Sequence, residues 1–202
     1  MNSKFKVFKY KSNKLNDFED HISIEEPLEI ILKYQDANQK WIEKTISITM
    51  RTPGDDEDLV RGFLFNEKVI DNLDYIEKIE SVGEPTEQYG LQNKIIVTIN
   101  NSENIDIDKI KRNFLTNSSC GVCGKSSLDV LEVIKKDKIN KFEPKISKEI
   151  LMKSPNNLRQ NQSEFSKTGG IHASGLFSIQ GDIVAIKEDV GRHNALDKLI
   201  GY

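Results

Sequence analysis

The chain of 202 residues contains only two cysteines, Cys120 and Cys123, and both lie in one short segment. Thiols placed this way are expected to take part in a reaction rather than to form a disulfide that stabilises the fold, as in proteins of reducing compartments. The sequence also lacks a run of about eighteen apolar residues, which excludes a membrane-spanning helix. Residues 1–14 lack the apolar stretch and cleavage site of a secretory signal. We therefore predict a cytoplasmic protein with no membrane association.

An excess of positive charge is absent too, because 29 lysines and arginines face 32 acidic residues and leave a net charge of −3. Bulk electrostatics therefore argue against nucleic acid as a partner, although small anionic ligands remain open. Hydrophobic residues make up 37% and charged residues 30%, which is typical of soluble globular proteins. A domain near this size buries roughly 70% of its unfolded surface, so it needs neither a disulfide nor a metal to fold.

Apolar patterns predict a mixture of strands and helices. Beta-branched residues predict one hairpin over 27–34 and 41–49 and another over 75–82 and 94–99. Acidic residues after Pro53 and Gly54 predict a helix that starts near Asp55. The other expected elements are helices at 106–115 and 127–136, strands at 173–179 and 183–187, and a last helix around 194–198. Within 147–165, Pro155 limits the prediction to a short helix followed by a second helical or irregular stretch. This alternation predicts an α/β or α+β architecture.

Three parts are expected along the chain. Residues 1–22 are polar without periodicity and are predicted to be a flexible N-terminal segment. Residues 23–115 are predicted to form a β-rich and helical part, and residues 116–202 to hold the cysteine loop and a C-terminal α/β part. No internal repeat or low-complexity run interrupts them.

The strongest chemical signal is the motif Cys120-Gly121-Val122-Cys123-Gly124-Lys125. Two thiols three residues apart can exchange a disulfide, or can present one nucleophile with a neighbour that resolves or tunes it. Glycines let the backbone bend and expose its N–H groups, and Lys125 adds positive charge. These features lower the pKa of a thiol and favour the reactive thiolate.

Four interpretations of this motif stay open on the residues alone. A structural zinc site needs four ligands, and the three histidines do not lie at finger-like spacing. A thioredoxin-like dithiol is expected after the first strand of a βαβ unit, whereas this motif lies past mid-chain. The cysteines could also pack as small apolar side chains. The fourth interpretation is another sulfur- or redox-active thiol.

Two further motifs are candidate binding sites. The segment Thr168-Gly169-Gly170-Ile171-His172 crowds small residues around a histidine, which suits either a phosphate or oxyanion loop or a tight turn. The segment Lys187–Lys198 brings acid, base and imidazole together where a strand ends and a helix begins, a frequent ligand position in α/β sheets. Ordinary helix capping is its alternative explanation. Arg51, before Thr52-Pro53-Gly54-Asp55, is a weaker candidate that a turn and an N-cap also explain.

Taken together, these motifs resemble the FdhD/NarQ family of formate dehydrogenase accessory sulfurtransferases. The resemblance rests on four segments in order and runs from about Glu25 to Tyr202: Met50–Leu59 with Gly62-Phe63-Leu64, Ser119–Lys125, Thr168–Ala173, and Glu188–Lys198. Four long motifs in order are far more specific than a lone Cys-x-x-Cys pair.

The resemblance implies a cytidine-deaminase-like three-layer fold, with a small N-terminal β-rich part, and a homodimer. It implies a sulfurtransferase that takes sulfane sulfur from a cysteine desulfurase and passes it to the molybdenum cofactor with two pterin guanine dinucleotides, for formate dehydrogenase. Cys120 would carry the persulfide, and Cys123 would be its partner. We predict that Gly169, Gly170, His172, Arg192 and His193 form the wall that binds the anionic cofactor. A GDP-like guanine nucleotide is a second candidate ligand, and no structural metal is expected.

Family members usually continue for several tens of residues after the helix around Asn194–Lys198, with a segment implicated in cofactor binding. The present sequence ends at Tyr202, so the cofactor site is expected to be incomplete and the chain to be a truncated or degenerate member. The competing hypothesis from another class is a carrier or insertion chaperone that binds the molybdenum cofactor or a guanine nucleotide without turning over sulfur. A zinc-stabilised interaction protein is the third hypothesis.

Overall fold

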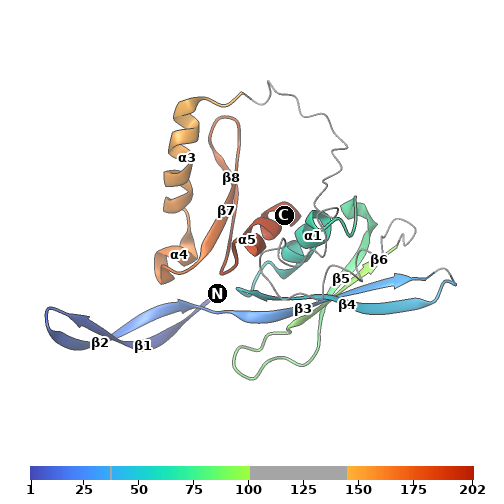
Figure 1. The fold of residues 1–202 in the computed structure, drawn as a ribbon, viewed down its shortest axis with the longest axis horizontal. Helices are drawn as coiled ribbons and strands as arrows, with labels where there is room; N and C mark the ends of the chain where they lie inside the picture. The colour runs from blue at the N-terminus through green and yellow to red at the C-terminus, as the bar shows by residue number, and fades with distance from the viewer. Residues whose placement is uncertain (37, 101–144) are drawn as a thin grey trace, which may run out of the picture.

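The computed structural model describes residues 1–36, 38–100 and 145–202 (Figure 1). Its described strands form three sheets, ordered β1-β2, β4-β3-β6-β5 and β7-β8. The elements are β1 (Asn2–Lys11), β2 (Lys14–Ser23), β3 (Glu26–Gln35), β4 (Trp41–Arg51), α1 (Asp56–Asn66), the 3-10 turn η1 (Leu73–Tyr75), β5 (Ile76–Val82), β6 (Lys94–Ile99), α3 (Lys148–Gln160), α4 (Ser163–Thr168), β7 (His172–Phe177), β8 (Ile183–Asp189) and α5 (Arg192–Gly201). The chain therefore mixes helices and strands, as predicted.

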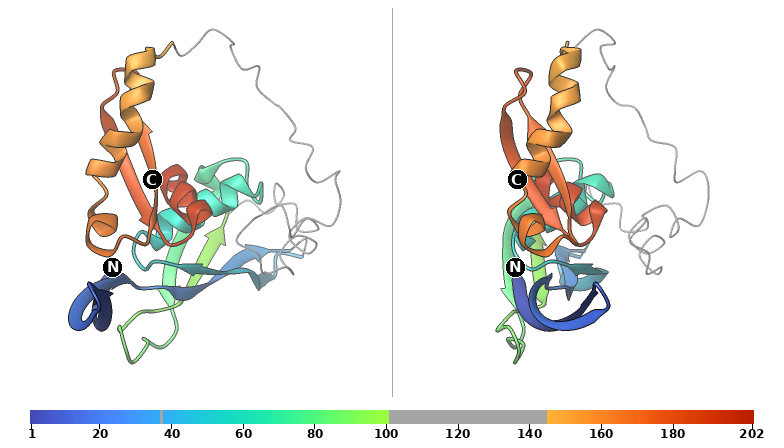
Figure 2. Two further views of the ribbon diagram at one scale, coloured as in Figure 1. Left: turned by 60° about the vertical axis from the view of Figure 1, so that its left-hand side comes forward. Right: turned by 90° about the vertical axis from the view of Figure 1, so that its left-hand side faces the viewer.

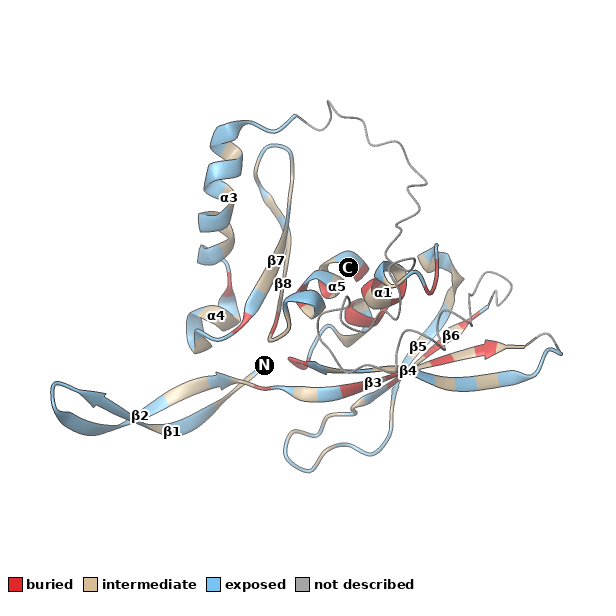
Figure 3. Ribbon diagram, viewed as in Figure 1, coloured by how far each residue is buried: buried red, intermediate tan, exposed pale blue. Residues whose placement is uncertain are grey.

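The four-stranded sheet carries the hydrophobic core on one face. Strand β3 lies in the centre, antiparallel to β4 and parallel to β6. Its apolar residues alternate along the strand, so Leu28, Ile30 and Leu32 all point into the core and are fully buried. Helix α1 covers this face with Leu59, Val60 and Leu64, which belong to the same buried cluster (Figure 3). The four-stranded sheet and α1 thus enclose the hydrophobic core, and the C-terminal elements pack onto this unit.

Further layers follow on the outer side of α1. Helix α5 packs along α1, and the β7–β8 hairpin packs against α5 (Figures 1 and 2). Helix α3 lies on the other face of that hairpin, where Leu158 approaches Gly175 and Ile150 approaches Gly181. The C-terminal elements are therefore held to the core through the α1–α5 contact.

Two glycines allow the two helices to approach closely. A Cβ atom on Gly62 of α1 would collide with the backbone carbonyl of Asp197 in α5. A Cβ atom on Gly201 of α5 would collide with the backbone carbonyl of Asp58 in α1. Backbone atoms cannot rotate away as a side chain can, so these two positions set the distance between the helices.

Several predicted elements are confirmed. The expected hairpins correspond to the antiparallel pairs β3–β4 and β5–β6. The expected helix near Asp55 is α1, which starts at Asp56 with three acidic residues in its first turn. The strands expected at 173–179 and 183–187 are β7 and β8, and they pair antiparallel. The helices expected at 106–115 and 127–136 lie outside the described residues.

Residues 1–22, predicted from their lack of periodicity to be a flexible segment, contain β1 and most of β2, and these strands pair along their whole length. The turn between them has positive φ at both Ser12 and Asn13, as in the two-residue turns that suit hairpins. Such turns are usually signalled by glycine, which this one lacks. We refer to residues 2–23 as the arm.

The expectation that Pro155 ends its helix is wrong, whereas the second helical stretch expected after that helix is α4. Helix α3 runs from Lys148 to Gln160 with Pro155 inside it. Proline removes one backbone hydrogen bond to the carbonyl four residues earlier, here that of Leu151. Leu151 and Pro155 are both exposed, so water can solvate this carbonyl and the helix continues.

Candidate functional site

The motif Cys120–Cys123, the predicted centre of the chemistry, lies outside the described residues. The structure does describe the other predicted site residues: Gly169, Gly170, His172, Arg192 and His193. They come from two neighbouring segments. His172 opens β7 in register with Asp189, the last residue of β8, so the turn before β7 and the turn before α5 lie side by side.

A buried ion pair organises the turn between β8 and α5. Lys198 Nζ lies 2.8 Å from Asp189 Oδ2, and both side chains are almost completely buried. Thr52 completes the arrangement, since its N–H donates to Asp189 and its carbonyl accepts from Lys198 Nζ at 2.7 Å. The second oxygen of Asp189 accepts from the N–H of Gly191 at 2.8 Å. The end of β4, the end of β8 and α5 are therefore joined through one carboxylate and one ammonium group.

Asn194 adds a second connection between α5 and the end of β4. Its Nδ2 donates to the carbonyl of Met50 at 2.7 Å and to Asp189 Oδ1 at 3.1 Å. Its Oδ1 accepts from the hydroxyl of Thr49 at 3.2 Å. Both hydrogen-bonding groups of the amide are used, so the first turn of α5 has a defined position.

This framework presents Arg192 and His193 at the surface. They are the first two residues of α5, and both are exposed. The N-cap, Gly191, has no side chain with which to cap the helix. A guanidinium and an imidazole at a helix N-terminus are groups that can bind an anion, and anion binding stays their predicted role.

The turn with Gly169 and Gly170 is positioned by Glu188, which precedes the buried Asp189. The carboxylate of Glu188 accepts from the N–H groups of Glu164 and Phe165, both at 2.9 Å, and thus caps the start of α4. Helix α4 then ends at Gly169, which adopts φ 68° in the left-handed region that favours glycine. The acidic residues of the last motif therefore serve the structure: Asp189 holds α5, and Glu188 holds α4.

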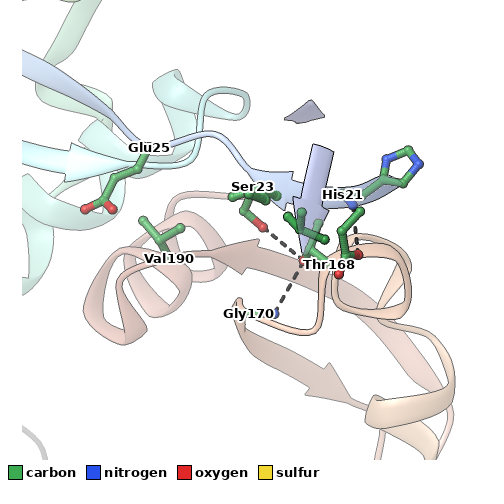
Figure 4. Close-up of a pocket in the computed structure, with 9 residues that line it drawn as sticks. His21, Ser23, Glu25, Thr168, Gly170 and Val190 are labelled. Carbon is green, nitrogen blue, oxygen red and sulfur yellow. Dashed lines mark hydrogen bonds between the residues drawn. The ribbon is translucent and has the colours of Figure 1, made fainter. Parts of the chain in front are cut away.

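A pocket of about 330 Å³ lies beside this turn (Figure 4). It is lined by Val7, Asp20, His21, Ile22, Ser23 and Glu25 from the first two strands and the residues after them, and by Thr168, Gly170 and Val190. Gly170 is the one predicted site residue among its lining residues. The carboxylates of Asp20 and Glu25 make this pocket a poor match for the anion-binding wall that the sequence predicts.

The residues that the arm contributes to the pocket were not identified from the sequence. Ser23 donates to the hydroxyl of Thr168 at 3.0 Å, and the ring nitrogen Nδ1 of His21 lies 2.8 Å from the amide oxygen of Asn2. Their segment matches no motif, and their position depends on a hairpin whose turn carries no glycine. The alternation of lysine with Phe5, Val7 and Tyr10 is the signal that could have revealed the strand.

Two basic residues near the site serve the structure instead. Arg51, the weaker sequence candidate, is fully buried and makes a bidentate pair with Asp56, with both contacts at 2.9 Å. Lys187 lies 2.7 Å from Asp58 Oδ2 and 3.0 Å from Asp55 Oδ1. Burial by itself would lower the pKa of Lys187, but these two carboxylates outweigh it and raise the pKa above its usual value. Neither cation is free for a ligand.

Asp197 makes the α1–α5 contact sensitive to pH. Its burial raises the pKa to about 7 from 3.8, although Asn66 donates a 2.6 Å hydrogen bond that acts in the opposite direction. The folded state therefore binds this proton more tightly than the unfolded state does. The resulting stabilisation is complete below about pH 4 and is lost as the pH rises to about 7.

We predict that the free energy of unfolding, measured with denaturant, falls between pH 5 and pH 8 and that Asp197→Asn removes part of this fall. The slope from one such group is at most about 1.4 kcal/mol per pH unit, and residual solvent access reduces it. Asp74→Asn is the matched control, because Asp74 is an exposed carboxylate. An unchanged pH profile for Asp197→Asn would contradict the assignment.

Within the described parts of the chain, no three His, Cys, Asp or Glu side chains gather to hold a metal ion. No helix among the described residues is long and apolar enough to cross a membrane.

Comparison with known proteins agrees with this combination of fold and motifs. The FdhD/NarQ family profile matches residues 23–202, so the chain belongs to the FdhD/NarQ family. The sulfur carrier protein FdhD of Sulfolobus acidocaldarius is 39% identical over 98% of this chain and 68% of its own length. The protein of the same name from Streptomyces avermitilis is 38% identical over 97% of this chain and 67% of its own length.

One solved structure has the same fold. It is the crystal structure of a candidate formate dehydrogenase accessory protein from Desulfotalea psychrophila, with a TM-score of 0.59 and 22% sequence identity. The match covers 99% of this chain and 68% of that one.

Proposed function

We propose that this protein is a sulfurtransferase that accepts sulfane sulfur as a persulfide on Cys120 and passes it to the molybdenum cofactor with two pterin guanine dinucleotides. The observation that carries the proposal is the family match over residues 23–202, which includes Cys120 and Cys123. The similar proteins named sulfur carrier protein FdhD support it. The client is formate dehydrogenase, as the name of the similar solved structure suggests.

The first chemical step, sulfur transfer from a donor persulfide to Cys120, requires no external oxidant. The Cys120 thiolate attacks the outer sulfur of a persulfide on a cysteine desulfurase, which forms one S–S bond while the donor's S–S bond breaks. The donor cysteine leaves as a thiolate. Cys123 is the partner thiol, and Gly121 and Gly124 give the segment the conformational freedom that delivery requires.

The described residues support the binding half of the proposal. Arg192 and His193 lie exposed at the N-terminus of α5, beside His172 and the Gly169–Gly170 turn. We propose that these groups bind the phosphates of the cofactor or of a GDP-like guanine nucleotide. The proposal also includes a homodimer, a cytoplasmic location and a cytidine-deaminase-like arrangement of the layers, with the part boundaries near residues 22 and 115.

Intact-mass measurement tests the proposed sulfur transfer. After incubation with cysteine and a purified cysteine desulfurase, the protein is expected to gain the mass of one sulfur atom, which a reducing agent removes. Cys120→Ala is expected to abolish the gain, because it removes the nucleophile. Cys123→Ala serves as the matched control and is expected still to take up sulfur.

The competing function, a carrier or insertion chaperone without sulfur turnover, predicts a different outcome. It requires that the wild-type protein bind a guanine nucleotide but gain no sulfur. Sulfur uptake that persists in Cys120→Ala would exclude the proposed role of Cys120.

A further inference from the structure

Arg192 and His193, the proposed phosphate-binding side chains, depend for their position on the backbone of α5. Both are exposed, and neither side chain makes a hydrogen bond or an ion pair with any residue that the structure describes. A long side chain without such contacts follows its backbone, so a tilt of the first turn of α5 would move both groups. The geometry of the proposed site therefore depends on what holds residues 192–195 in place.

Asn194 holds this turn to the end of β4. Its Nδ2 donates to the carbonyl of Met50 at 2.7 Å, and its Oδ1 accepts from the hydroxyl of Thr49 at 3.2 Å. These two partners are neighbours in β4, so both ends of the amide bind one short piece of strand. Among the described residues of the first turn, only Asn194 has a side chain that hydrogen-bonds to another element. The turn is thus attached to the four-stranded sheet through one side-chain amide.

The same amide closes the turn between β8 and α5. Asn194 Nδ2 also donates to Asp189 Oδ1 at 3.1 Å, and that oxygen accepts from the N–H of Gly191, the N-cap of α5, at 2.8 Å. In a capping box, the side chain at the third helical position bonds directly to the N–H of the N-cap. Asn194 occupies that position and reaches the N-cap through the carboxylate of Asp189, which the ammonium group of Lys198 holds in place.

Gly191 shows how closely Asn194 fills this turn. Its φ of −96° is accessible to any residue, so the backbone conformation does not require glycine here. A Cβ atom on Gly191 would lie 3.1 Å from Asn194 Nδ2 and 3.4 Å from Asp189 Oδ1. The amide of Asn194 therefore occupies the space that a capping side chain would need. The helix lacks a side-chain cap at a position where serine or aspartate usually stabilises a helix.

Asn194 has no donor left with which to bind an anion. Both N–H bonds of its amide nitrogen are used, one toward the carbonyl of Met50 and one toward Asp189. Its side chain is half-buried, whereas Arg192 is exposed with its guanidinium unpaired among the described residues. Asn194 therefore supports the groups that bind and does not itself contact the ligand.

We propose that Asn194 is a positioning residue for phosphate binding. Its three hydrogen bonds fix the first turn of α5 so that Arg192 and His193 meet the phosphates of a bound nucleotide together. Thr49 takes part through Asn194, because its hydroxyl donates to the amide oxygen. This role rests on the proposed function, in which these basic groups bind the cofactor or a GDP-like nucleotide. Groups that bind a ligand must be held within about 0.5 Å of their productive geometry, which supporting hydrogen bonds achieve.

Isothermal titration calorimetry of the full chain with GDP tests this role. Asn194→Ala is expected to bind GDP at least about ten-fold more weakly, because the two basic side chains no longer converge on the phosphates. Thr49→Val removes only the hydroxyl and is expected to weaken binding about two- to four-fold. Asn161→Ala is the matched control and is expected to bind GDP as the wild type does. Asn161 Nδ2 also donates to a backbone carbonyl, at 2.8 Å, but it lies at the end of α3.

Two readouts distinguish positioning from general destabilisation. Asn194→Ala is expected to weaken the binding of GDP and of inorganic pyrophosphate by similar factors, whereas guanosine, which has no phosphate, is expected to bind it as it binds the wild type. Thr49→Val is expected to have no further effect in the Asn194→Ala protein, because both substitutions act through one amide. Thr49→Ser retains the hydroxyl and is expected to retain wild-type affinity. Circular dichroism at the titration temperature verifies that each variant is folded.

Equal GDP affinity of the wild type and Asn194→Ala would overturn the positioning role and leave the proposed phosphate site intact. Equal losses of GDP and guanosine affinity would also overturn it, because the substitution would then act on the fold as a whole. If Asn194→Ala does not fold, Thr49→Val decides, and its unchanged GDP affinity would overturn the role. No binding of GDP or pyrophosphate by the wild type would overturn the phosphate-binding half of the proposed function together with this role, whereas sulfur uptake on Cys120 is judged separately by mass.

Discussion

Lys198→Met is expected to lower the free energy of unfolding by about 3–5 kcal/mol, the usual cost of removing one partner of a buried ion pair. Lys198 is 1% exposed, and its ammonium group contacts both the Asp189 carboxylate and the carbonyl of Thr52. Methionine fills a similar volume but leaves the negative charge of Asp189 without its counter-ion. Urea or guanidinium unfolding followed by circular dichroism measures the loss.

Lys33→Met is the matched control for this prediction. Lys33 lies 3.0 Å from Glu43, but the two side chains are 36% and 49% exposed, in contrast to the buried pair. An exposed pair of this kind contributes about 0–1 kcal/mol, so the same substitution is expected to have little effect there. Equal losses at positions 33 and 198 would show that the buried pair does not hold the β8–α5 turn in place.

Gly62→Ala is expected to destabilise the protein by about 1–3 kcal/mol, as overpacking does, even though alanine favours helices. By helix propensity alone, the substitution should stabilise α1 by about 1 kcal/mol. The added Cβ atom would collide with the backbone carbonyl of Asp197, so α5 must move away from α1. The sign of the measured change therefore decides between local propensity and tertiary packing.

Gly170→Ala provides the comparison, because an added Cβ atom there meets only one backbone oxygen, at 3.9 Å. Its free energy of unfolding is expected to stay within about 0.5 kcal/mol of the wild type. A stabilised Gly62→Ala protein would mean that α1 and α5 do not approach as closely as the structure shows.

Much of the fold could be predicted from local patterns. Beta-branched residues predicted β3 and β6, and acidic residues after Pro53–Gly54 predicted the start of α1. The arm was not predicted, because its turn uses Ser12 and Asn13 in place of glycine. The continuation of α3 through Pro155 was not predicted either, because it depends on which face of the helix meets solvent.

The sequence predicted which residues belong to the candidate site, but it predicted only some of their contacts in the fold. His172 opens β7, and Arg192 and His193 open α5, so the turns before these two elements lie side by side. Lys187 opens the segment that was predicted to be a ligand position, but Asp55 and Asp58 already neutralise its charge. These partners lie far away in the sequence, so no motif within residues 187–198 could reveal them.

The sequence by itself determined the family, the alternation of strands and helices and the position of the two cysteines, because each of these depends on residue order and local periodicity. Tertiary structure alone decided which charges are free and which are committed. Arg51, Lys187 and Lys198 look alike in the sequence as basic residues of site-like motifs, yet all three pair with carboxylates in the fold. Arg192 stays exposed at the start of α5, because the role of a charge depends on the groups that folding brings next to it.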